Sequence, residues 1–477
     1  MTVDAALAAI RDALGPDGWL AAEADVAPYL SDFRRLYRGT TPLVARPNSV
    51  AAVAQVLAIC HAARIGVVPH GGNTSYCGGA TPRESGGEII LSLARLNRVR
   101  RVDAAGYALT LDAGCTLAAA QAAAGTAGLR LPLSLGSEGS CQVGGNLSTN
   151  AGGTAVLRFG MMRELVLGLE VVLPDGRVLD QLRSLRKDNT GYDVKQLFLG
   201  AEGTLGVITG ACLKLFAAPH DFLTALVAVD GIEAAVALLG RVRSVFGDAV
   251  EGFEYLPRIA QELAVRHVAG VSEPFNAPHP AAVLVELAAP RETAALRGAF
   301  EEFLAGEIDA GRARDAVVAA SGPQRDALWF LREHVPEAQT REGASLKHDV
   351  SLPIARLGEF VRAAERMLGT LAPAARIVGY GHVGDGNLHF NLSPAPGVGR
   401  GSKAEAEFLA LAPTVQRAIH DLVAELGGSF SAEHGIGRLK VGELERYEDP
   451  VALDLMRRVK AAVDPHGIMN PGKVLRS

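Results

Sequence analysis

The chain has 477 residues, of which 48% are hydrophobic and 21% charged, a balance typical of a soluble globular protein with two or three domains. Its net charge of -5 provides no basic footprint for nucleic acid or for an anionic membrane surface. The five cysteines include no C-x-x-C pair, which argues against a disulfide framework or a structural zinc finger and favours the reducing cytoplasm.

The first part of the chain alternates short strands and helices with glycine-rich loops. Residues 1–19 predict an amphipathic helix rather than a signal peptide, because charged side chains interrupt the apolar ones. Residues 41–69 follow as strand, helix and strand, with a Pro-Asn-Ser start signal for the helix and Gly66 as its stop. The second of these strands leads into the glycine-rich loop 70–82, and 87–93 is a further strand. No uncharged apolar run is long enough to span a bilayer.

Two more glycine clusters, at 136–153 and 198–216, occur in the same part of the chain. A strand at 107–115 and a helix at 116–128 precede the first of them, and a β-hairpin at 165–179 precedes the second. A single cluster would most simply be a set of tight turns. Three clusters favour loops whose backbone N–H groups approach the phosphates of a cofactor.

From about residue 219 the pattern changes, which predicts a separate α+β domain. Strand–helix units are expected at 223–245 and 351–370, and a strand at 281–289. Helices are expected at 291–305 and, over a longer stretch, at 403–426.

Residues 379–392, GYGHVGDGNLHFNL, have the GxGxxG spacing of a dinucleotide-binding loop. Such a loop requires a helix after its glycines, because the helix N-terminus binds the pyrophosphate. Here the following residues alternate with period two, which puts Asn387, His389 and Asn391 on one face of a strand. We therefore reject the nicotinamide interpretation of this stretch.

The histidines of this stretch favour a metal site instead. His382 lies on the glycine-rich turn and His389 on the strand, while Glu433 and His434 are adjacent in a later glycine-bounded loop. Two imidazoles and a carboxylate form a common catalytic ligand set for zinc or a similar divalent ion. From the spacing alone, hydrogen-bonded loop histidines account for these residues equally well.

Six motifs in one order make the chain resemble a known family: PHGGNTSYCGGA, GSCQVGGNLSTNAGG, GYDVKQLFLGAEGTLGVIT, GYGHVGDGNLHFNL, SAEHGIG and GIMNPGKVL. Together they resemble the flavin-dependent 2-hydroxyacid dehydrogenases of the vanillyl-alcohol-oxidase type. The resemblance runs from about residue 25 to the C-terminus. The most similar branch is that of D-2-hydroxyglutarate dehydrogenase, with D-lactate dehydrogenase and the glycolate oxidase flavin subunit as relatives.

The resemblance implies an α+β fold in three parts. Residues 1–218 are expected to form a PCMH-type FAD-binding domain of two α/β subdomains, with the N-terminal helical segment. Residues 219–439 are expected to form an α+β substrate (cap) domain with an antiparallel sheet and the metal site. Residues 440–477 are expected to be a helical segment that returns to the FAD-binding domain.

The resemblance also implies noncovalent FAD. Covalent members of the wider superfamily carry a histidine after the Gly-Gly of the first loop, where this chain has Asn73. The residues that match FAD-lining positions are Pro69, Gly71, Gly72, Asn73, Thr74, Ser75, Gly78, Gly79, Gly139, Ser140, Gly144, Gly145, Thr149, Asn150, Gly152, Glu202, Ile208 and Asn470.

The resemblance assigns His382, His389 and Glu433 as ligands of zinc or a similar divalent cation, and His434 as the catalytic base. The implied reaction oxidises a D-2-hydroxy acid to the 2-oxo acid by hydride transfer to flavin N5. A divalent cation lowers the pKa of the substrate hydroxyl, and a neutral imidazole accepts its proton. The electrons then pass to a carrier such as electron-transfer flavoprotein or a quinone.

The substrate carboxylates require cations, and Arg332 and Lys347 match the carboxylate-binding positions of the hydroxyglutarate branch. Asn391 matches another substrate contact. The branch usually has threonine four residues after this arginine, where this chain has Pro336, which offers neither a hydroxyl nor an N–H. The departure leaves a shorter or differently shaped D-2-hydroxy acid open as the substrate.

Other functions remain open at this point. Within the family, the alternative is a D-lactate or glycolate-type flavin dehydrogenase. Outside it, the chain could be a zinc hydrolase that uses the His/His/Glu set without flavin, or a redox-dead binding protein, which the intact Glu433-His434 pair argues against. The oligomeric state is open, with a homodimer as one alternative, and neither nucleic acid nor a transmembrane segment is expected.

Overall fold

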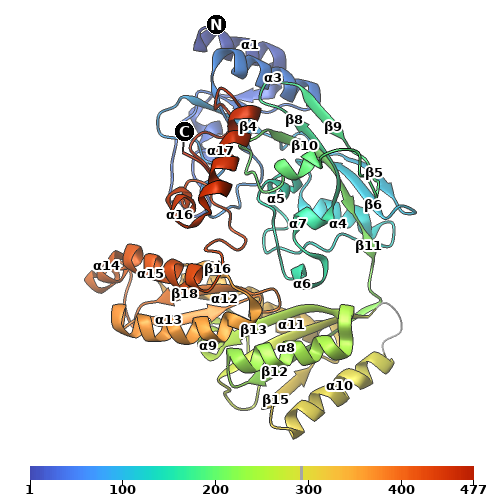
Figure 1. The fold of residues 1–477 in the computed structure, drawn as a ribbon, viewed down its shortest axis with the longest axis vertical. Coiled ribbons are helices and arrows are strands. Elements are labelled where there is room, and N and C mark those ends of the chain that lie inside the picture. The colour runs from blue at the N-terminus through green and yellow to red at the C-terminus, as the bar shows by residue number, and fades with distance from the viewer. Residues whose placement is uncertain (290–293, 477) are drawn as a thin grey trace. The chain divides into compact units, whose positions relative to one another are not determined.

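The alternation of short strands and helices in the first part of the sequence produces one of two units in this computed structural model (Figure 1), which describes residues 1–289 and 294–476. Unit 1 comprises Met1–Gly153, Phe159–Ala218 and the chain from Glu433 onward. Unit 2 comprises Thr154–Arg158 and Pro219–Ala432. Within the described residues, no helix combines the length and the apolar character needed to cross a bilayer.

The strands of unit 1 form a four-stranded sheet of order β1-β2-β4-β3, a five-stranded sheet of order β5-β6-β10-β8-β9 and the pair β11-β7. Strands β2, β3 and β4 pair in parallel, as expected where a helix connects two strands of one sheet, and the five-stranded sheet is antiparallel. Their bounds are β1 Trp19–Leu20, β2 Val44–Ala45, β3 Gly66–His70, β4 Glu88–Ser92, β5 Val99–Asp103, β6 Ala108–Asp112, β7 Leu129–Arg130, β8 Val166–Val172, β9 Val178–Gln181, β10 Val207–Lys214 and β11 Phe216–Ala217.

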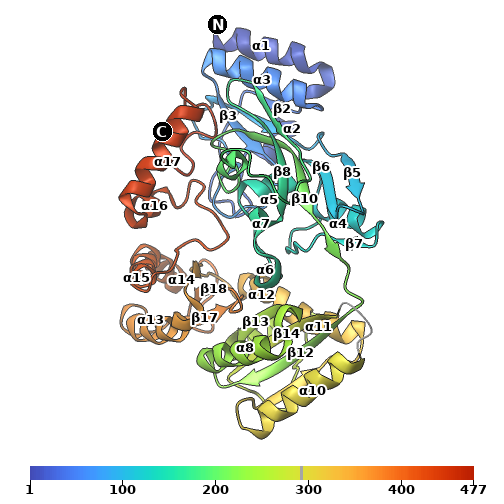
Figure 2. The same cartoon turned by 45° about the vertical axis from the view of Figure 1, so that its right-hand side comes forward.

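Helices cover these sheets and complete the core of unit 1, and α1 lies beside α3 in both views (Figures 1 and 2). Their bounds are α1 Val3–Leu14, α2 Glu23–Val26, α3 Val50–Ala63, α4 Leu117–Gly125, α5 Val143–Ser148, α7 Met162–Leu165, α16 Val441–Tyr447 and α17 Pro450–Val463, with the 3-10 turns η1 Pro16–Gly18, η2 Ala27–Tyr29 and η3 Val194–Leu197. Helix α3 starts as predicted, because the Ser49 hydroxyl accepts the Ala52 N–H at 3.2 Å. The predicted stop at Gly66 is wrong: Arg64 ends the helix at a φ of 53°, and Gly66 already belongs to β3.

The C-terminal segment packs along β3 within unit 1. The Val67 N–H donates to the Ile468 carbonyl at 2.7 Å, and the Asn470 N–H donates to the Val67 carbonyl at 2.8 Å. Each bond satisfies a backbone group that the edge of the sheet would otherwise leave open. The expected return of the tail to the first domain is confirmed.

Unit 2 contains two antiparallel sheets, β13-β14-β12-β15 and β16-β18-β17, which share one apolar core. The strand bounds are β12 Asp221–Val229, β13 Val250–Pro257, β14 Ala281–Ala289, β15 Asp315–Val318, β16 Asp349–Ser351, β17 Arg376–Tyr380 and β18 Asn387–Ser393. The helix bounds are α6 Val156–Phe159, α8 Ile232–Phe246, η4 Gly247–Ala249, α9 Arg258–His267, α10 Ala294–Asp309, α11 Gly322–Glu333, α12 Val335–Glu342, η5 Ile354–Arg356, α13 Leu357–Leu371, α14 Lys403–Ala410 and α15 Ala412–Glu425.

Two helix predictions in unit 2 need comment. The single long helix predicted at 403–426 is two consecutive helices, α14 and α15, which meet at Leu411. Pro413 explains the break, because its ring has no N–H for a continuous helix and is accepted in the first turn of a new one. The helix predicted at 291–305 corresponds to α10, and residues 291–293 of that prediction lie outside the described residues.

Candidate functional site

The loops predicted to bind FAD converge within unit 1. A Cβ on Gly72 would lie 2.1 Å from the Ser140 carbonyl oxygen, so only glycine allows these two loops to approach so closely. The Asn470 side-chain N–H groups donate to the Gly79 carbonyl at 2.9 Å and the Glu202 carbonyl at 2.8 Å. Four segments that are far apart in the sequence therefore meet, namely the loop after β3, the residues before α5, the turn before β10 and the C-terminal tail.

The remaining predicted FAD residues lie in or beside these segments. Asn73 adopts a φ of 53° and its side-chain N–H donates to the Ser31 carbonyl at 2.8 Å. Thr149 donates its hydroxyl to the Gly145 carbonyl at 2.9 Å, and Asn150 accepts the Arg163 N–H at 2.9 Å. Ile208 is different in kind, because it is buried inside β10 in the core of unit 1.

These segments also carry buried polar atoms that suit a polar cofactor. The side-chain oxygens of Gln142, Asn146 and Asn470 are buried with no hydrogen-bond partner among the described residues. An unpaired buried acceptor costs about 1–3 kcal/mol, so a group with matching donors is expected against them. The residues present fit FAD, whose ring system and ribityl and ribose hydroxyls offer such donors. The sequence interpretation missed Gln142 and Asn146, although both lie inside the second glycine cluster.

His70, the last residue of β3, immediately precedes the first glycine-rich loop. Burial lowers the pKa of His70 to about 4, against a smaller opposing contribution from the Gly71 backbone. Its folded-state pKa therefore lies below the value of about 6.5 in an unfolded chain. The imidazole is neutral in the folded protein at neutral pH.

We expect this buried histidine to make unit 1 less stable in mild acid. The unfolded chain takes up the proton first, so stability that is present above about pH 6.5 is lost as the pH falls toward 4. The loss between pH 7.5 and pH 5 is about 2 kcal/mol. Urea unfolding of the wild type and His70→Gln at both pH values measures it, and equal losses in the two proteins would contradict the prediction.

The predicted metal ligands of unit 2 lie around one polar face of the sheet β16-β18-β17. His389 in β18 stands opposite Asp349 in β16 and opposite Tyr380 in β17. The His389 Nδ1 lies 4.0 Å from the nearer Asp349 carboxylate oxygen, and the ring centroids of His382 and His389 are 5.4 Å apart. Asn387, on the same strand face, donates to that Asp349 oxygen at 3.0 Å.

His382 and Arg332 share one buried carboxylate that the sequence interpretation did not single out. The His382 Nδ1–H donates to Oε1 of Glu254 in β13 at 2.6 Å, and the Arg332 Nε–H donates to Oε2 at 2.7 Å. Burial alone would raise the pKa of Glu254, but the neighbouring His382 and Arg332 lower it to about 2. Because the carboxylate holds Nδ1–H, Nε2 is the His382 nitrogen that can face a metal ion.

The predicted substrate residues are Asn391 in β18 and Lys347, two residues before β16. The pairing of Asp349 with His389 sets a register in which Lys347 lies opposite Asn391. Residues directly opposite in an antiparallel pair have Cβ atoms about 5 Å apart. The Asn391 side-chain oxygen Oδ1 accepts the His348 N–H at 3.1 Å, and the Asn391 side-chain N–H donates to the Gln339 side-chain oxygen at 2.9 Å. Lys347 is exposed, whereas Asn391 and Gln339 are buried.

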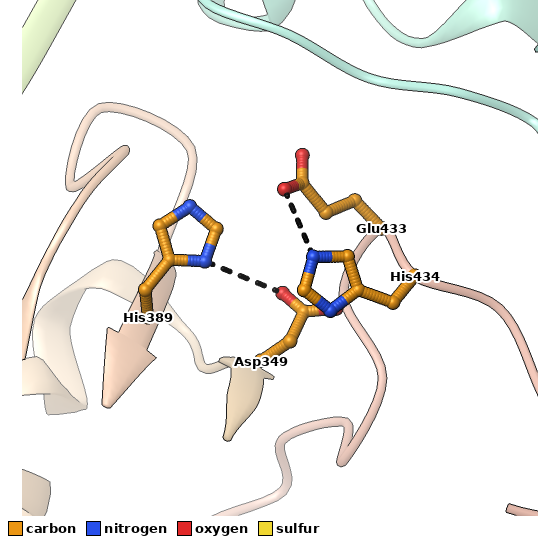
Figure 3. Close-up of side chains that lie close together, drawn as sticks. All are labelled: Asp349, His389, Glu433 and His434. Carbon is orange, nitrogen blue, oxygen red and sulfur yellow. Dashed lines mark ion pairs between the residues drawn. The ribbon is translucent and has the colours of Figure 1, made fainter. Parts of the chain in front are cut away.

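Glu433 and His434 belong to unit 1, directly after the last residue of unit 2. The His434 Nε2 lies 3.6 Å from a Glu433 oxygen, and the His434 ring packs edge-on against Tyr76 with centroids 4.6 Å apart. Figure 3 draws one ion pair from each unit, His389–Asp349 and His434–Glu433. Within unit 2, its last residue Ala432 donates its N–H to the Asp349 carbonyl at 3.3 Å.

Each of these four residues offers a ligand atom to a metal ion, a carboxylate oxygen or an imidazole nitrogen. Asp349 was absent from the predicted ligand set, and His382, which belongs to that set, is not one of these four residues. The His382 ring lies near that of His389 instead. The donor set of nitrogen and oxygen atoms suits zinc or a similar divalent cation. Within unit 2, His389 and Asp349 supply a nitrogen and an oxygen donor, which fit the divalent metal ion expected from the sequence.

Two family descriptions match the chain. Residues 41–181 match "FAD binding domain", and residues 218–474 match "FAD linked oxidases, C-terminal domain". Together they bear out the prediction of a flavoprotein with this domain pair.

Among curated proteins, mitochondrial D-2-hydroxyglutarate dehydrogenase of Bos taurus is 40% identical over 454 residues, which cover 94% of this chain and 80% of that protein. D-2-hydroxyglutarate dehydrogenase of Xanthomonas citri pv. viticola is 36% identical over 456 residues, 95% of this chain and 93% of that protein.

Among solved structures, p-cresol methylhydroxylase with substrate bound matches with a TM-score of 0.77 at 17% identity, covering 99% of this chain and 97% of that one. An alkyldihydroxyacetonephosphate synthase matches with a TM-score of 0.75 at 16% identity, and the match covers 99% of this chain and 86% of that one. At these identities the likeness shows the fold alone, and it confirms the predicted α+β fold.

Proposed function

Because the chain belongs to the FAD-linked oxidases, as an FAD-dependent enzyme of the D-2-hydroxyglutarate dehydrogenase type, we propose that it oxidises a D-2-hydroxy acid to the 2-oxo acid with the help of a divalent cation. The observation that carries this proposal is the polar face around β18, where two histidines, two carboxylates and Arg332 meet in one unit. Family membership decides against a flavin-free zinc hydrolase and against a redox-dead binding protein.

The roles follow from the chemistry of the residues. His382 and His389, with Glu433, would hold the cation, and Asp349 offers a further carboxylate beside His389. FAD, when bound, accepts the hydride from the substrate Cα, and the cation, when bound, lowers the pKa of the substrate hydroxyl. His434 would take the hydroxyl proton on a ring nitrogen, as a neutral imidazole does near physiological pH.

Two positively charged side chains, those of Lys347 and Arg332, support the proposal of an acidic substrate. Lys347, opposite Asn391, provides an exposed ammonium group beside the polar strand face. Arg332 is held against Glu254 on one side and lies 5.2 Å above the Tyr380 ring. Pro336 lies in the first turn of α12 and contributes no hydroxyl. A 2-hydroxyglutarate-like acid is our proposal, and this missing hydroxyl keeps D-lactate or a glycolate-like acid as the alternative.

The test is a panel of D- and L-2-hydroxy acids added without oxygen to the purified, yellow protein. We expect D-2-hydroxyglutarate or a similar D-acid to bleach the flavin and the matching L-acid to leave it unchanged. Bleaching by D-lactate or glycolate alone would favour the alternative, and a flavin that no 2-hydroxy acid reduces would overturn the proposal.

The acceptor, the assembly and the location are proposals of the same kind. We propose that the reduced flavin is reoxidised by electron-transfer flavoprotein or a quinone, in the cytoplasm and in a protein that can form homodimers. Reoxidation rates with each acceptor, cell fractionation and the mass of the protein in solution test these three points.

A further inference from the structure

Glu202 lies on the turn before β10 and has a backbone conformation that is unusual for glutamate. Its φ is 50°, in the left-handed region, which costs roughly 1 kcal/mol or more for a residue with a Cβ. The Glu202 N–H donates to the Ser148 carbonyl at the end of α5, at 2.8 Å. A strained residue persists where its surroundings hold it, so the contacts of its side chain need an explanation.

The Glu202 carboxylate binds two consecutive backbone N–H groups of the loop that carries Glu433 and His434. Oε1 accepts the Ile436 N–H at 2.7 Å, and Oε2 accepts the Gly437 N–H at 2.8 Å. Both oxygens act as acceptors only, which a carboxylate can do and a carboxamide cannot. Glu202 was predicted to line FAD, but these bonds point its carboxylate at the loop after His434.

Two glycines make this approach possible. A Cβ on Gly435 would lie 2.7 Å from the Glu202 Oε1, and a Cβ on Gly437 would lie 2.1 Å from the Cys77 carbonyl oxygen. The same Cys77 carbonyl accepts the Arg438 N–H at 2.8 Å. The loop after His434 therefore packs between Glu202 and the first glycine-rich loop.

Asn470 completes the connection on the cofactor side. Its side chain donates to the Glu202 carbonyl and to the Gly79 carbonyl, and its own oxygen is buried with no partner among the described residues. The FAD-binding loop, Glu202 and the loop after His434 thus form one hydrogen-bonded clamp inside unit 1. Only two peptide units, at most about 7 Å of chain, separate His434 from Ile436.

We infer that Glu202 is a positioning residue, which holds the loop after His434 against the FAD-binding loop so that the His434 imidazole stays at a fixed place relative to the flavin. The inference deepens the proposed function, since it rests on His434 as the base. Its structural part, the clamp itself, can be tested without turnover.

The test compares the wild type with Glu202→Gln in the FAD-loaded protein. Glutamine turns one acceptor into a donor that faces a backbone N–H, so one of the two bonds is lost. We expect hydrogen exchange of the Ile436 and Gly437 amides to speed up about tenfold or more. We expect kcat to fall roughly 10- to 100-fold with little change in KM or in bound FAD, because a small displacement of a reacting group has effects of this size.

Asp464→Asn is the matched control. Its two oxygens accept the consecutive Ile468 and Met469 N–H groups at 3.1 and 2.8 Å in the same unit, and Oδ2 also pairs with Lys460, but this segment carries no base. We expect faster exchange at Ile468 and Met469 and a kcat within about twofold of the wild type. If Glu202→Gln does not fold, Glu202→Asp, which keeps both acceptors on a shorter side chain, gives the same comparison with smaller effects.

Hydrogen exchange tests the clamp, and kcat tests the positioning role of Glu202. Unchanged exchange at Ile436 and Gly437 overturns the clamp. Faster exchange with an unchanged kcat overturns the positioning role. If kcat is also unchanged in His434→Ala, the base assignment of the proposed function fails, whereas a kcat that falls in His434→Ala but not in Glu202→Gln leaves that assignment intact.

Discussion

Replacing His389 with alanine is expected to abolish dye reduction by a D-2-hydroxy acid while FAD stays bound. His389 is in unit 2, whereas the loops predicted to bind FAD are in unit 1, so flavin content should not change. Loss of a cation that stabilises the developing alkoxide removes several kcal/mol, or roughly 10²- to 10⁴-fold in turnover. Steady-state dye reduction, metal analysis and the visible flavin spectrum of the same sample measure these three quantities.

Removal of the metal from the wild type should reproduce this result. A chelator is expected to stop dye reduction, and added zinc or manganese should restore it without any addition of FAD. His420→Ala is a suitable control, because His420 is a buried histidine of α15 in the same unit and is outside the proposed ligand set. Metal-free protein that retains full turnover would exclude the cation from the reaction.

The period-two pattern of β18 was the most informative local signal in the sequence. It put Asn387, His389 and Asn391 on one face, and in the structure these residues contact Asp349 and Gln339 on that face. The alternating residues Leu388, Phe390 and Leu392 are fully buried in the core. A strand that is polar on one face and apolar on the other can be recognised from the sequence alone, because its side chains alternate with period two.

The partners of these residues could not be predicted in the same way. Glu254 is 128 residues from His382, and no local spacing connects a carboxylate in β13 with a turn before β18. Asp349 faces His389 only because β16 pairs with β18 in one register, and a shift by a single residue would turn Asp349 to the other face. The pairing register of two strands that are far apart in the sequence cannot be predicted from either strand alone.

Helix α5 shows a different limit. Its sequence contains Gly144 and Gly145, and glycine disfavours helix by about 1 kcal/mol per residue, so the second glycine cluster gave no sign of a helix. A Cβ on Gly144 would lie 2.8 Å from the Cβ of Ala113, the residue after β6, so close packing at this place needs the glycine. Packing in this case outweighs intrinsic propensity.

Glu254→Gln is expected to reduce metal affinity and substrate binding together. The carboxylate fixes the tautomer of His382 through one oxygen and holds Arg332 through the other, and all three side chains are buried. Loss of a carboxylate that orients a ligand histidine typically costs 10- to 100-fold in metal affinity. The amide also removes the negative charge beside the Arg332 guanidinium, and a buried pair broken on one side costs about 3–5 kcal/mol.

The matched control for this variant is Glu286→Gln. Glu286 in β14 is likewise a buried carboxylate of unit 2, and it binds Arg325 at 2.7 and 2.8 Å and the Trp329 indole N–H at 2.7 Å, away from the histidines. Both variants should lower the melting temperature, but only Glu254→Gln should weaken zinc binding in titration and raise the KM for the acid. Equal zinc affinity in Glu254→Gln and the wild type would mean that His382 does not depend on Glu254 for its orientation. A loss of stability alone, shared by both variants, would assign Glu254 to folding rather than to the site.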